Sequence, residues 1–364
     1  MKNPIKKEKW NSKLKKGKIK VRFNPYTYVR TIVMKTLLLD RQDYDKLIKM
    51  DFNEISGFLQ ETDYKKDIDR HAARFSGAQL LEKSVVSNLS SSFEKLKRIS
   101  SEDIKRIIEE YLKRNDIENI KTVIRGVATK TEASKIADTI IESGTLSREY
   151  YESLISMKSM NDVVKGFGII NAEEEGILSL IEEGKSLAEI ENVIDKAYYL
   201  NLVNFSKKIS KQGRIMKEFL SAEMEVTNIL TVIRLKKAGK FPKDIEGMVF
   251  YMDEKKYDKF LKDLVNSKSI EDIFAIIEKS RFAECVKNGI EQFRKNSSMI
   301  DFEIGMKKYL LSRYKLLAHK NMLSIDSILS YMFSKDVEAR NLRIIVKGKQ
   351  LGVGNEFIEK QIIV

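Results

Sequence analysis

The chain has 364 residues, 33% of them charged, and a formal net charge of +14. A soluble protein of this length buries roughly 75% of the surface of its unfolded chain and usually forms more than one domain. Because no run approaches the roughly 18 consecutive apolar residues of a spanning helix, and no apolar segment at the start resembles a secretory signal, we expect neither an integral membrane protein nor a signal peptide.

The first 22 residues carry most of the excess charge. They contain nine Lys and one Arg against one Glu, so the remaining 342 residues carry only +5. We expect residues 1–24 to be a disordered basic extension. An alternative is that residues 1–22 lie on anionic lipid, where each base contributes about 1 kcal/mol near the surface, or on nucleic acid.

The rest of the chain predicts an all-α fold. From Tyr26 onward only Pro242 interrupts helix-forming sequence. The stretch ISSEDIKRIIEEYLKR (99–114) places its apolar residues on one helical stripe, with charged residues opposite. Ser101 precedes this run, and Ser159, Ser186 and Ser269 each start a Ser-x-x-acid capping box. No series of alternating strands with hairpin turns is present.

One ten-residue motif occurs three times, as DIENIKTVIR (116–125), EVTNILTVIR (225–234) and EARNLRIIVK (338–347). The copies are 109 and 113 residues apart, which is too long for helical repeats of about 34 to 47 residues. We therefore expect three helical units with boundaries at 25–172, 173–285 and 286–364. The third copy would be truncated at Val364.

On a helix the motif places an acid inside an apolar face, an asparagine at the edge of that face and a base pointing away. A buried carboxylate is costly unless it is paired and hydrogen-bonded. We expect each acid to meet a base or several backbone donors, with Arg30, Lys196 and Arg313 as candidate bases. Proton relay and metal binding are disfavoured, because no His or second carboxylate recurs at ligand spacing. The residues of this structural signature are Asp116, Asn119 and Arg125, then Glu225, Asn228 and Arg234, then Glu338, Asn341 and Lys347.

The sequence offers no recognisable catalytic, cofactor or metal site. His71 and His319 lie in unrelated contexts, and with Cys285 they form no zinc site or catalytic triad. A single cysteine excludes an intramolecular disulfide and fits a reducing compartment, so we expect a buried thiol. The segment GKQLGVG (348–354) lacks the spacing of a phosphate-binding loop. We expect a protein without enzymatic activity and without a cofactor.

Several segments together resemble the C subunit of archaeal A-type and related bacterial V/A-type ATP synthases, a relative of the d subunit of vacuolar ATPases. The resemblance covers about Tyr26 to Val364. The segments are YTYVRTIVMKTLLLDRQDYDKLIKMDFNEISGFLQETDY (26–64), GAQLLEKSVVSNL (77–89), YLKRNDIENIKTVIRG (111–126), IDKAYYLNL (194–202) and EARNLRIIVKGK (338–349).

This resemblance implies a non-catalytic rotor part at the cytoplasmic face of the cell membrane. It implies a funnel of three similar all-α units around a pseudo-threefold axis. The mouth would hold the D and F subunits of the central stalk, and the narrow end would sit on the membrane proteolipid ring. The loops 126–131, 235–240 and 348–354 follow the three motif copies. Under pseudosymmetry these loops would surround one rim, which would face either the shaft or the ring. The alternative is that they are ordinary turns between helices.

A second hypothesis is a helical scaffold that binds nucleic acid or an anionic surface through its basic arm. It predicts that log K falls by about 0.9 per neutralised phosphate as log salt concentration rises. Deleting residues 1–22 would abolish that binding. The rotor hypothesis expects no specific nucleic acid and expects ring binding to survive the deletion.

Overall fold

The structure, a computed structural model, describes residues 19–22, 24–157, 159–171, 175–210, 212–251, 259–320 and 322–364. Within these ranges the chain forms helices and no strand. An isolated parallel bridge joins Ile19 to Ile209, beside the hydrogen bond from Ile19 N to Lys208 O (2.8 Å). The all-α prediction is therefore confirmed. The predicted basic extension lies largely outside the described residues, which begin at Ile19.

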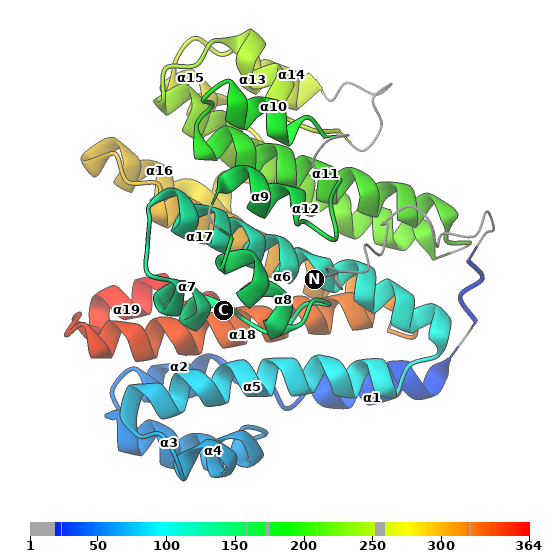
Figure 1. Cartoon of the computed structure of the whole chain (residues 1–364), viewed down its shortest axis with the longest axis vertical. Helices are drawn as coiled ribbons and strands as arrows, with labels where there is room; N and C mark the ends of the chain where they lie inside the picture. Colours follow the sequence, from blue (N-terminus) through cyan, green and yellow to red (C-terminus); the bar gives the residue numbers. More distant parts are fainter. Residues whose placement is uncertain are drawn as a thin grey trace.

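Nineteen helices follow one another in the described part of the chain (Figure 1). The first ten are α1 (Pro25–Lys35), α2 (Arg41–Leu47), α3 (Phe52–Gln60), α4 (Lys65–Ala72), α5 (Gly77–Arg98), α6 (Glu102–Ala128), α7 (Ala133–Thr139), α8 (Arg148–Ile155), α9 (Met160–Lys165) and α10 (Ile177–Glu182). The others are α11 (Leu187–Lys208), α12 (Gly213–Lys237), α13 (Pro242–Met248), α14 (Lys259–Asn266), α15 (Ile270–Ile277), α16 (Ala283–Asn296), α17 (Ile300–Lys320), α18 (Ile325–Gln350) and α19 (Asn355–Gln361).

Local sequence explains where several of these helices begin. The side chains of Ser159, Ser186 and Ser269 accept hydrogen bonds from the backbone N–H three residues later, at the starts of α9, α11 and α15. Such caps satisfy an N–H group that the helix itself leaves unpaired. Ser101 also precedes α6, although its side chain makes no capping hydrogen bond. Pro242 occupies the first turn of α13, where a missing N–H costs nothing.

The body consists of three consecutive pairs of long helices, namely α5 with α6, α11 with α12, and α17 with α18 (Figure 1). The motif copies lie on the second helix of each pair. Helix α18 packs against α1, α5, α12 and α17, so the C-terminal pair contacts the start of the chain. The short helices lie around this body, with α3 and α4 at one end and α13 to α15 at the other (Figure 1).

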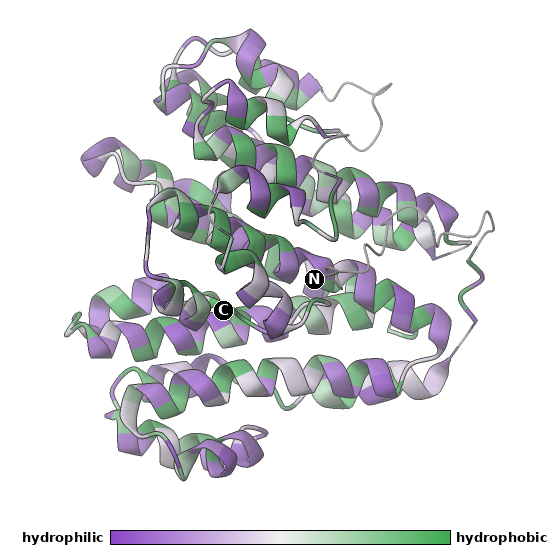
Figure 2. Ribbon diagram, viewed as in Figure 1, coloured by the Kyte–Doolittle hydropathy of each residue, from purple (hydrophilic) through white to green (hydrophobic). Residues whose placement is uncertain are grey.

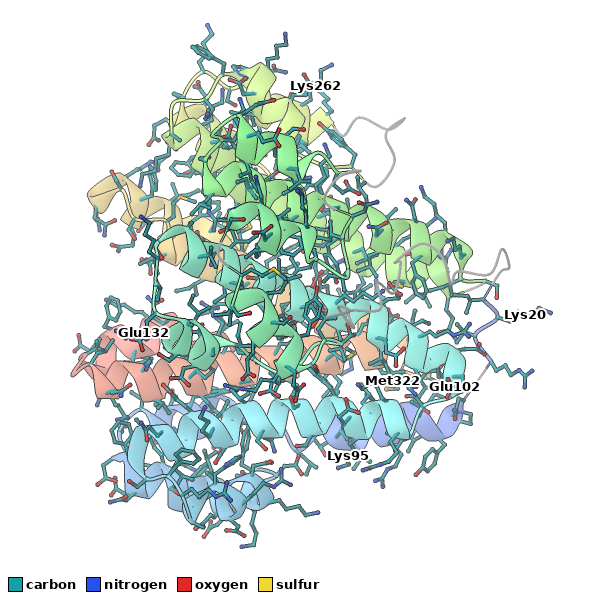
Figure 3. The ribbon with its side chains drawn as sticks, viewed as in Figure 1. Lys20, Lys95, Glu102, Glu132, Lys262 and Met322 are labelled. Carbon is teal, nitrogen blue, oxygen red and sulfur yellow. The ribbon has the colours of Figure 1, made fainter. Side chains whose placement is uncertain are left out.

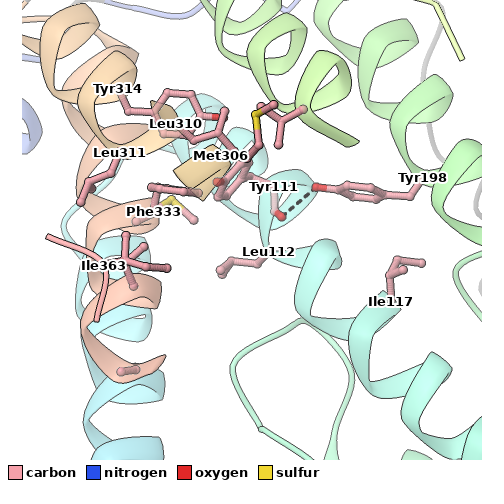
Figure 4. Close-up of a cluster of buried hydrophobic side chains, with 14 of the residues drawn as sticks. Tyr111, Leu112, Ile117, Tyr198, Met306, Leu310, Leu311, Tyr314, Phe333 and Ile363 are labelled. Atoms are coloured by element: carbon pink, nitrogen blue, oxygen red, sulfur yellow. Dashed lines mark hydrogen bonds between the residues drawn. The ribbon is translucent and has the colours of Figure 1, made fainter. Parts of the chain in front are cut away.

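The core lies where α6, α11, α12, α17 and α18 meet. Aromatic rings fill much of it. Tyr314 stacks on Phe219 and meets Phe333 edge-on at 4.6 Å between ring centroids. The Tyr198 hydroxyl donates to the carbonyl of Tyr111 (3.1 Å; Figure 4), so a buried phenol keeps a hydrogen-bond partner. The rings thus tie all three long pairs into one core.

The helices are amphipathic, and their polar faces point outward. Apolar and polar residues alternate along the ribbons (Figure 2), and charged side chains such as Lys95, Glu102 and Lys262 project from the periphery (Figure 3). Among the described helices, none combines the length and the apolar character that crossing a membrane requires.

Helices α16 and α17 approach closely at two glycines. A Cβ atom at Gly289 would overlap the backbone of Phe302, and one at Gly305 would overlap the carbonyl of Cys285. Interiors are close-packed, so neither backbone can move aside cheaply. Both positions therefore require a residue without a side chain.

We expect Gly289→Ala to lower the free energy of unfolding by about 3 kcal/mol, because overpacking displaces backbone rather than a flexible side chain. Urea denaturation measures this loss. The matched control is Gly247→Ala in α13, where a Cβ atom would have no neighbour within 4 Å. The control should be neutral or slightly stabilising, since Ala favours helix over Gly by about 1 kcal/mol. Equal losses in both variants would contradict the proposed steric cause.

Candidate functional site

The three motif asparagines make the same pair of hydrogen bonds. Each side-chain amide donates to a backbone carbonyl, and its oxygen accepts from the N–H of that same residue. In every copy the partner lies 22 residues later in the chain. The pairs are Asn119 with Ile141 (2.8 and 3.1 Å), Asn228 with Phe250 (2.7 and 3.1 Å) and Asn341 with Ile363 (2.7 and 3.1 Å).

Each asparagine holds the end of a loop that contains one short helix, namely α7, α13 or α19. The turn after the motif has the same form in all three copies. A residue in the left-handed conformation, Lys130, Gly239 or Gly352, terminates the long helix. The next N–H then bonds to a carbonyl five residues earlier, at 2.8 to 3.0 Å. This is a common helix C-cap geometry, and here the loops 126–131, 235–240 and 348–353 share it.

Replacing Asn341 by alanine should cost about 2 kcal/mol of stability, because the buried N–H and C=O of Ile363 would both lose their partner. Urea denaturation gives the total. Hydrogen exchange should show faster exchange at Ile363. The control, Asn355→Ala, removes an exposed side chain at the start of α19 and should change stability by less than about 0.5 kcal/mol. Unchanged exchange at Ile363 would contradict the assignment.

Asp116 is fully buried and satisfied by donors outside its helix. It accepts hydrogen bonds from the N–H groups of Thr145 (2.8 Å) and Leu146 (3.1 Å), which immediately precede α8. The hydroxyls of Thr145 and Tyr151 also donate to it, each at 2.6 Å. Gly144 leaves room for this carboxylate, since a Cβ atom there would overlap it. Several neutral donors thus replace the base that a buried acid often requires.

Glu338 is buried in the same way and accepts hydrogen bonds from the N-terminal part of the chain. Its donors are the Leu39 N–H (2.6 Å), the Tyr64 hydroxyl (2.7 Å) and the Lys335 ammonium (2.6 Å). Lys335 and Glu338 are each only 2% exposed. Because Lys335 and Glu338 are three residues apart on α18, they form a buried ion pair within one helix turn.

Glu225 differs from the other two acids. Its side chain is about a quarter exposed (26%) and forms an ion pair with Arg281. Two bases outside the three candidates therefore pair with motif acids, Lys335 with Glu338 and Arg281 with Glu225. Lys196 donates instead to the Gly247 carbonyl (3.2 Å). Arg30 lies on the exposed side of α1, and Arg313 is half-buried on α17.

The N-terminal segment contacts the acid of the third motif copy as residues 146–167 contact the acid of the first. Residues 39–58 (LDRQDYDKLIKMDFNEISGF) follow the pattern of residues 146–167 (LSREYYESLISMKSMNDVVKGF), and both contain Leu-x-Arg-x-x-Tyr-x-x-Leu-Ile. Leu39 donates to Glu338 as Leu146 donates to Asp116. Tyr44 and Tyr151 are both buried, and burial together with the nearby acid raises the pKa of each phenol. This shared pattern was the signal that could have revealed the match from the sequence.

The three motif bases join the long helices in a cyclic order. Arg125 of α6 pairs with Glu191 of α11 (2.5 Å). Arg234 of α12 pairs with Glu303 of α17 (2.6 Å), and Lys347 of α18 returns to Glu82 of α5 (3.0 Å). The three glutamates are 109 and 112 residues apart, close to the spacing of the motif itself.

A largely buried polar cluster lies where α6, α12 and α18 meet. Its members, Arg114, Glu223 and Asp336, each stand two residues before a motif acid. Arg114 pairs with Glu223 at 2.7 Å, and the Tyr111 hydroxyl donates to the same carboxylate (3.2 Å). Burial, together with Glu223, raises the pKa of Asp336 to about 7 despite the opposing charge of Arg114. Only the register of the motif could have indicated this cluster, since the three residues differ in type.

The structure shows how the other candidate groups are placed. His71 lies on α4 and His319 on α17. The Cys285 thiol is half-buried and donates to the Phe282 carbonyl, and burial raises its pKa to about 11. Thiols react as thiolates, so this environment disfavours reactivity. Within the described ranges no three His, Cys, Asp or Glu side chains are grouped so that they could hold a metal ion.

Comparisons with known proteins cover nearly the whole chain. The ATP synthase (C/AC39) subunit family matches residues 28–361. The A-type ATP synthase C subunit of Methanosarcina mazei is 31% identical over 350 residues, which is 93% of this chain and 92% of the relative. The corresponding proteins of Archaeoglobus fulgidus and Haloquadratum walsbyi are 29% and 27% identical, again over 93% of this chain and over 96% and 98% of the relatives. The resemblance found in the sequence is confirmed, and the chain belongs to the ATP synthase (C/AC39) subunit family.

Proposed function

We propose that this chain is the non-catalytic rotor adaptor of an A-type or V-type ATP synthase. In this role it joins the D and F subunits of the central stalk to the membrane proteolipid ring. Ion flow would turn the ring, the adaptor would turn with it, and the shaft would carry the torque to the catalytic head for ATP synthesis. Membership of the ATP synthase (C/AC39) subunit family over residues 28–361 is the observation that carries this proposal.

We also propose that three units, 25–172, 173–285 and 286–364, surround a pseudo-threefold axis and form a funnel, with residues 39–58 completing the third. Two observations support this arrangement. The asparagine loops recur three times with the same geometry, and the three inter-helix ion pairs follow a cyclic order that returns to α5. The nine signature residues are then equivalent structural positions of one repeated scaffold.

An adaptor under torque must resist bending. Pro-poor helices packed over a continuous core supply that stiffness, because close-packed interiors have low compressibility. Completion of the third unit by the N-terminal segment adds to it, since Glu338 ties the last long helix to Leu39 and Tyr64. The two interfaces must each hold under load, and a stable interface buries about 1,600 Å² or more.

We expect the full-length chain to co-sediment with the purified proteolipid ring and with the D and F subunits in one complex. It would bind the side of the ring that faces the cytoplasm in the membrane. A variant that lacks residues 1–18 should do the same, because it keeps the bridge between Ile19 and Ile209. The measurement is co-sedimentation of each form with ring, with shaft and with both.

Three outcomes separate the alternatives. Failure of both forms to join ring and shaft would contradict the adaptor function. Loss of ring binding in the shortened form alone would assign the basic arm to an anionic lipid contact. Binding of the full-length form alone to nucleic acid, in place of ring and shaft, would favour the scaffold hypothesis, and the affinity would fall steeply with salt.

A further inference from the structure

We propose that α18 forms a basic wall, defined by Arg340, Arg343 and Lys347, that receives an acidic helical segment of the central stalk and so selects one rotational setting of the shaft. This inference rests on the proposed function. A pseudo-threefold socket offers an inserted shaft three similar settings, and only a difference among the equivalent walls can choose between them.

The equivalent positions on the three motif helices carry different charges. On α18 all three are basic. On α12 they are Thr227, Leu230 and Arg234, and on α6 they are Glu118, Lys121 and Arg125. Each set is spaced three and four residues apart, so it occupies one face of its helix. The wall on α18 is therefore the most basic of the three.

Carboxylates compensate the bases on α6 and α12. Lys121 pairs with Asp195 (2.9 Å) and with Glu118 (2.7 Å). Arg125 pairs with Glu191 through two short hydrogen bonds, at 2.6 and 2.5 Å. Arg234 likewise pairs with Glu303 (2.6 Å). The corresponding faces of α6 and α12 therefore carry little uncompensated positive charge.

Among the described residues, Lys347 of the basic wall pairs with Glu82, but Arg340 and Arg343 form no salt bridge. Glu82, whose charge acts on Arg343, already pairs with Lys347, and Glu303, whose charge acts on Arg340, already pairs with Arg234. Burial lowers the pKa of both arginines. The Nη1 atom of Arg340 is buried and has no hydrogen-bond partner among the described residues. The guanidinium groups of Arg340 and Arg343 are thus partly removed from water, and no carboxylate among the described residues pairs with either of them.

Nearby groups strengthen this excess of positive charge. Lys307 of α17 lies close enough to Arg340 that burial and this like charge lower its pKa to about 8. A hollow of about 230 Å³ opens beside the wall, lined by Glu82, Arg340, Arg343, Ile344 and Lys347. It gives a side chain from outside access to the two arginines.

The wall runs over two helical turns, from Arg340 to Lys347, so it fits acids spaced along a helix better than one small anion. Arginine forks bind carboxylates through paired hydrogen bonds, which fix orientation as well as charge. Complementary charge across an interface sets register and excludes wrong arrangements. An acidic face on the shaft would therefore be held against α18 and not against α6 or α12.

The test compares two double variants, each of which removes two positive charges. Arg340→Gln with Arg343→Gln alters the basic wall, and Arg98→Gln with Arg106→Gln alters two exposed arginines of α5 and α6 as a matched control. The measurements are the free energy of unfolding, the Kd for the purified D and F subunits at low and high salt, and co-sedimentation with the ring.

We expect the wall variant to bind the shaft about tenfold more weakly at low salt, with a smaller salt dependence, and to bind the ring normally. Its stability should be unchanged or higher, because burial disfavours both charges. The control should bind like the unaltered chain.

Equal shaft affinity in the wall variant and the unaltered chain would overturn the basic-wall proposal and leave the adaptor function intact. A loss of affinity that tracks a loss of stability would overturn it too, since the arginines would then be structural. If the unaltered chain itself binds no shaft, the adaptor function fails, and this inference fails with it.

Discussion

Replacing Asp116 by alanine is expected to lower the free energy of unfolding by about 4 kcal/mol. The substitution leaves the N–H groups of Thr145 and Leu146 and the hydroxyl of Tyr151 without their shared acceptor. Each buried donor left unsatisfied costs about 1–3 kcal/mol, and the gap left by the carboxylate cannot bring in a new acceptor from the apolar surroundings. Urea denaturation at neutral pH measures the loss.

The control for this prediction is Asp138→Ala, which removes an exposed acid from α7 in the same unit. Exposed substitutions of this kind change stability by about 0.5 kcal/mol or less. Asp116→Asn should fall between the two, because the amide keeps one acceptor but brings two donors that need partners. If Asp116→Ala were as stable as the control, the anchoring role of this acid would be refuted.

Replacing Asp336 by asparagine should have the opposite effect and stabilise the protein at pH 8. In the folded chain the pKa of this aspartate is about 7, whereas an unfolded aspartate has a pKa of about 3.9. Its Oδ2 atom is buried without a hydrogen-bond partner among the described residues, so ionisation is costly. A neutral amide avoids that cost, and the gain should be about 2–4 kcal/mol.

The pH dependence distinguishes this effect from a change in packing. The folded form holds the proton more tightly, so stability falls as the pH rises from about 4 to about 7 and then levels off. The gain from Asp336→Asn should therefore vanish below about pH 4 and be complete above about pH 7. Denaturation curves of both proteins across this range measure it, with Asp138→Asn as the exposed control. A gain independent of pH would refute ionisation as the cause.

The opposite signs of these two predictions follow from how each carboxylate is surrounded. Asp116 faces four hydrogen-bond donors within its own unit, so its charge is well solvated by the protein. Asp336 shares one arginine with Glu223, and the two acids repel each other. A buried cluster with this composition costs stability, yet it links residues of α6, α12 and α18.

The sequence by itself determined the features that depend on short-range order. Helical periodicity and the Ser-x-x-acid caps act within one or two turns, so the all-α class and the starts of α9, α11 and α15 could be predicted. The threefold recurrence of the motif was also visible, because Asn119, Asn228 and Asn341 stand at the same position of three similar ten-residue segments.

Only the tertiary structure decided which groups meet those residues. The donors to Asp116 lie 29 to 35 residues away, on the loop before α8 and on α8 itself, and those to Glu338 include Leu39 and Tyr64 from the other end of the chain. Helical projection locates an acid on a face but does not say which loop covers that face. The candidate bases Arg30, Lys196 and Arg313 lie on helices that precede the three motif copies in the sequence. The structure instead satisfies each acid with whatever donors the packed loops bring to it, because burial requires a partner but does not specify which.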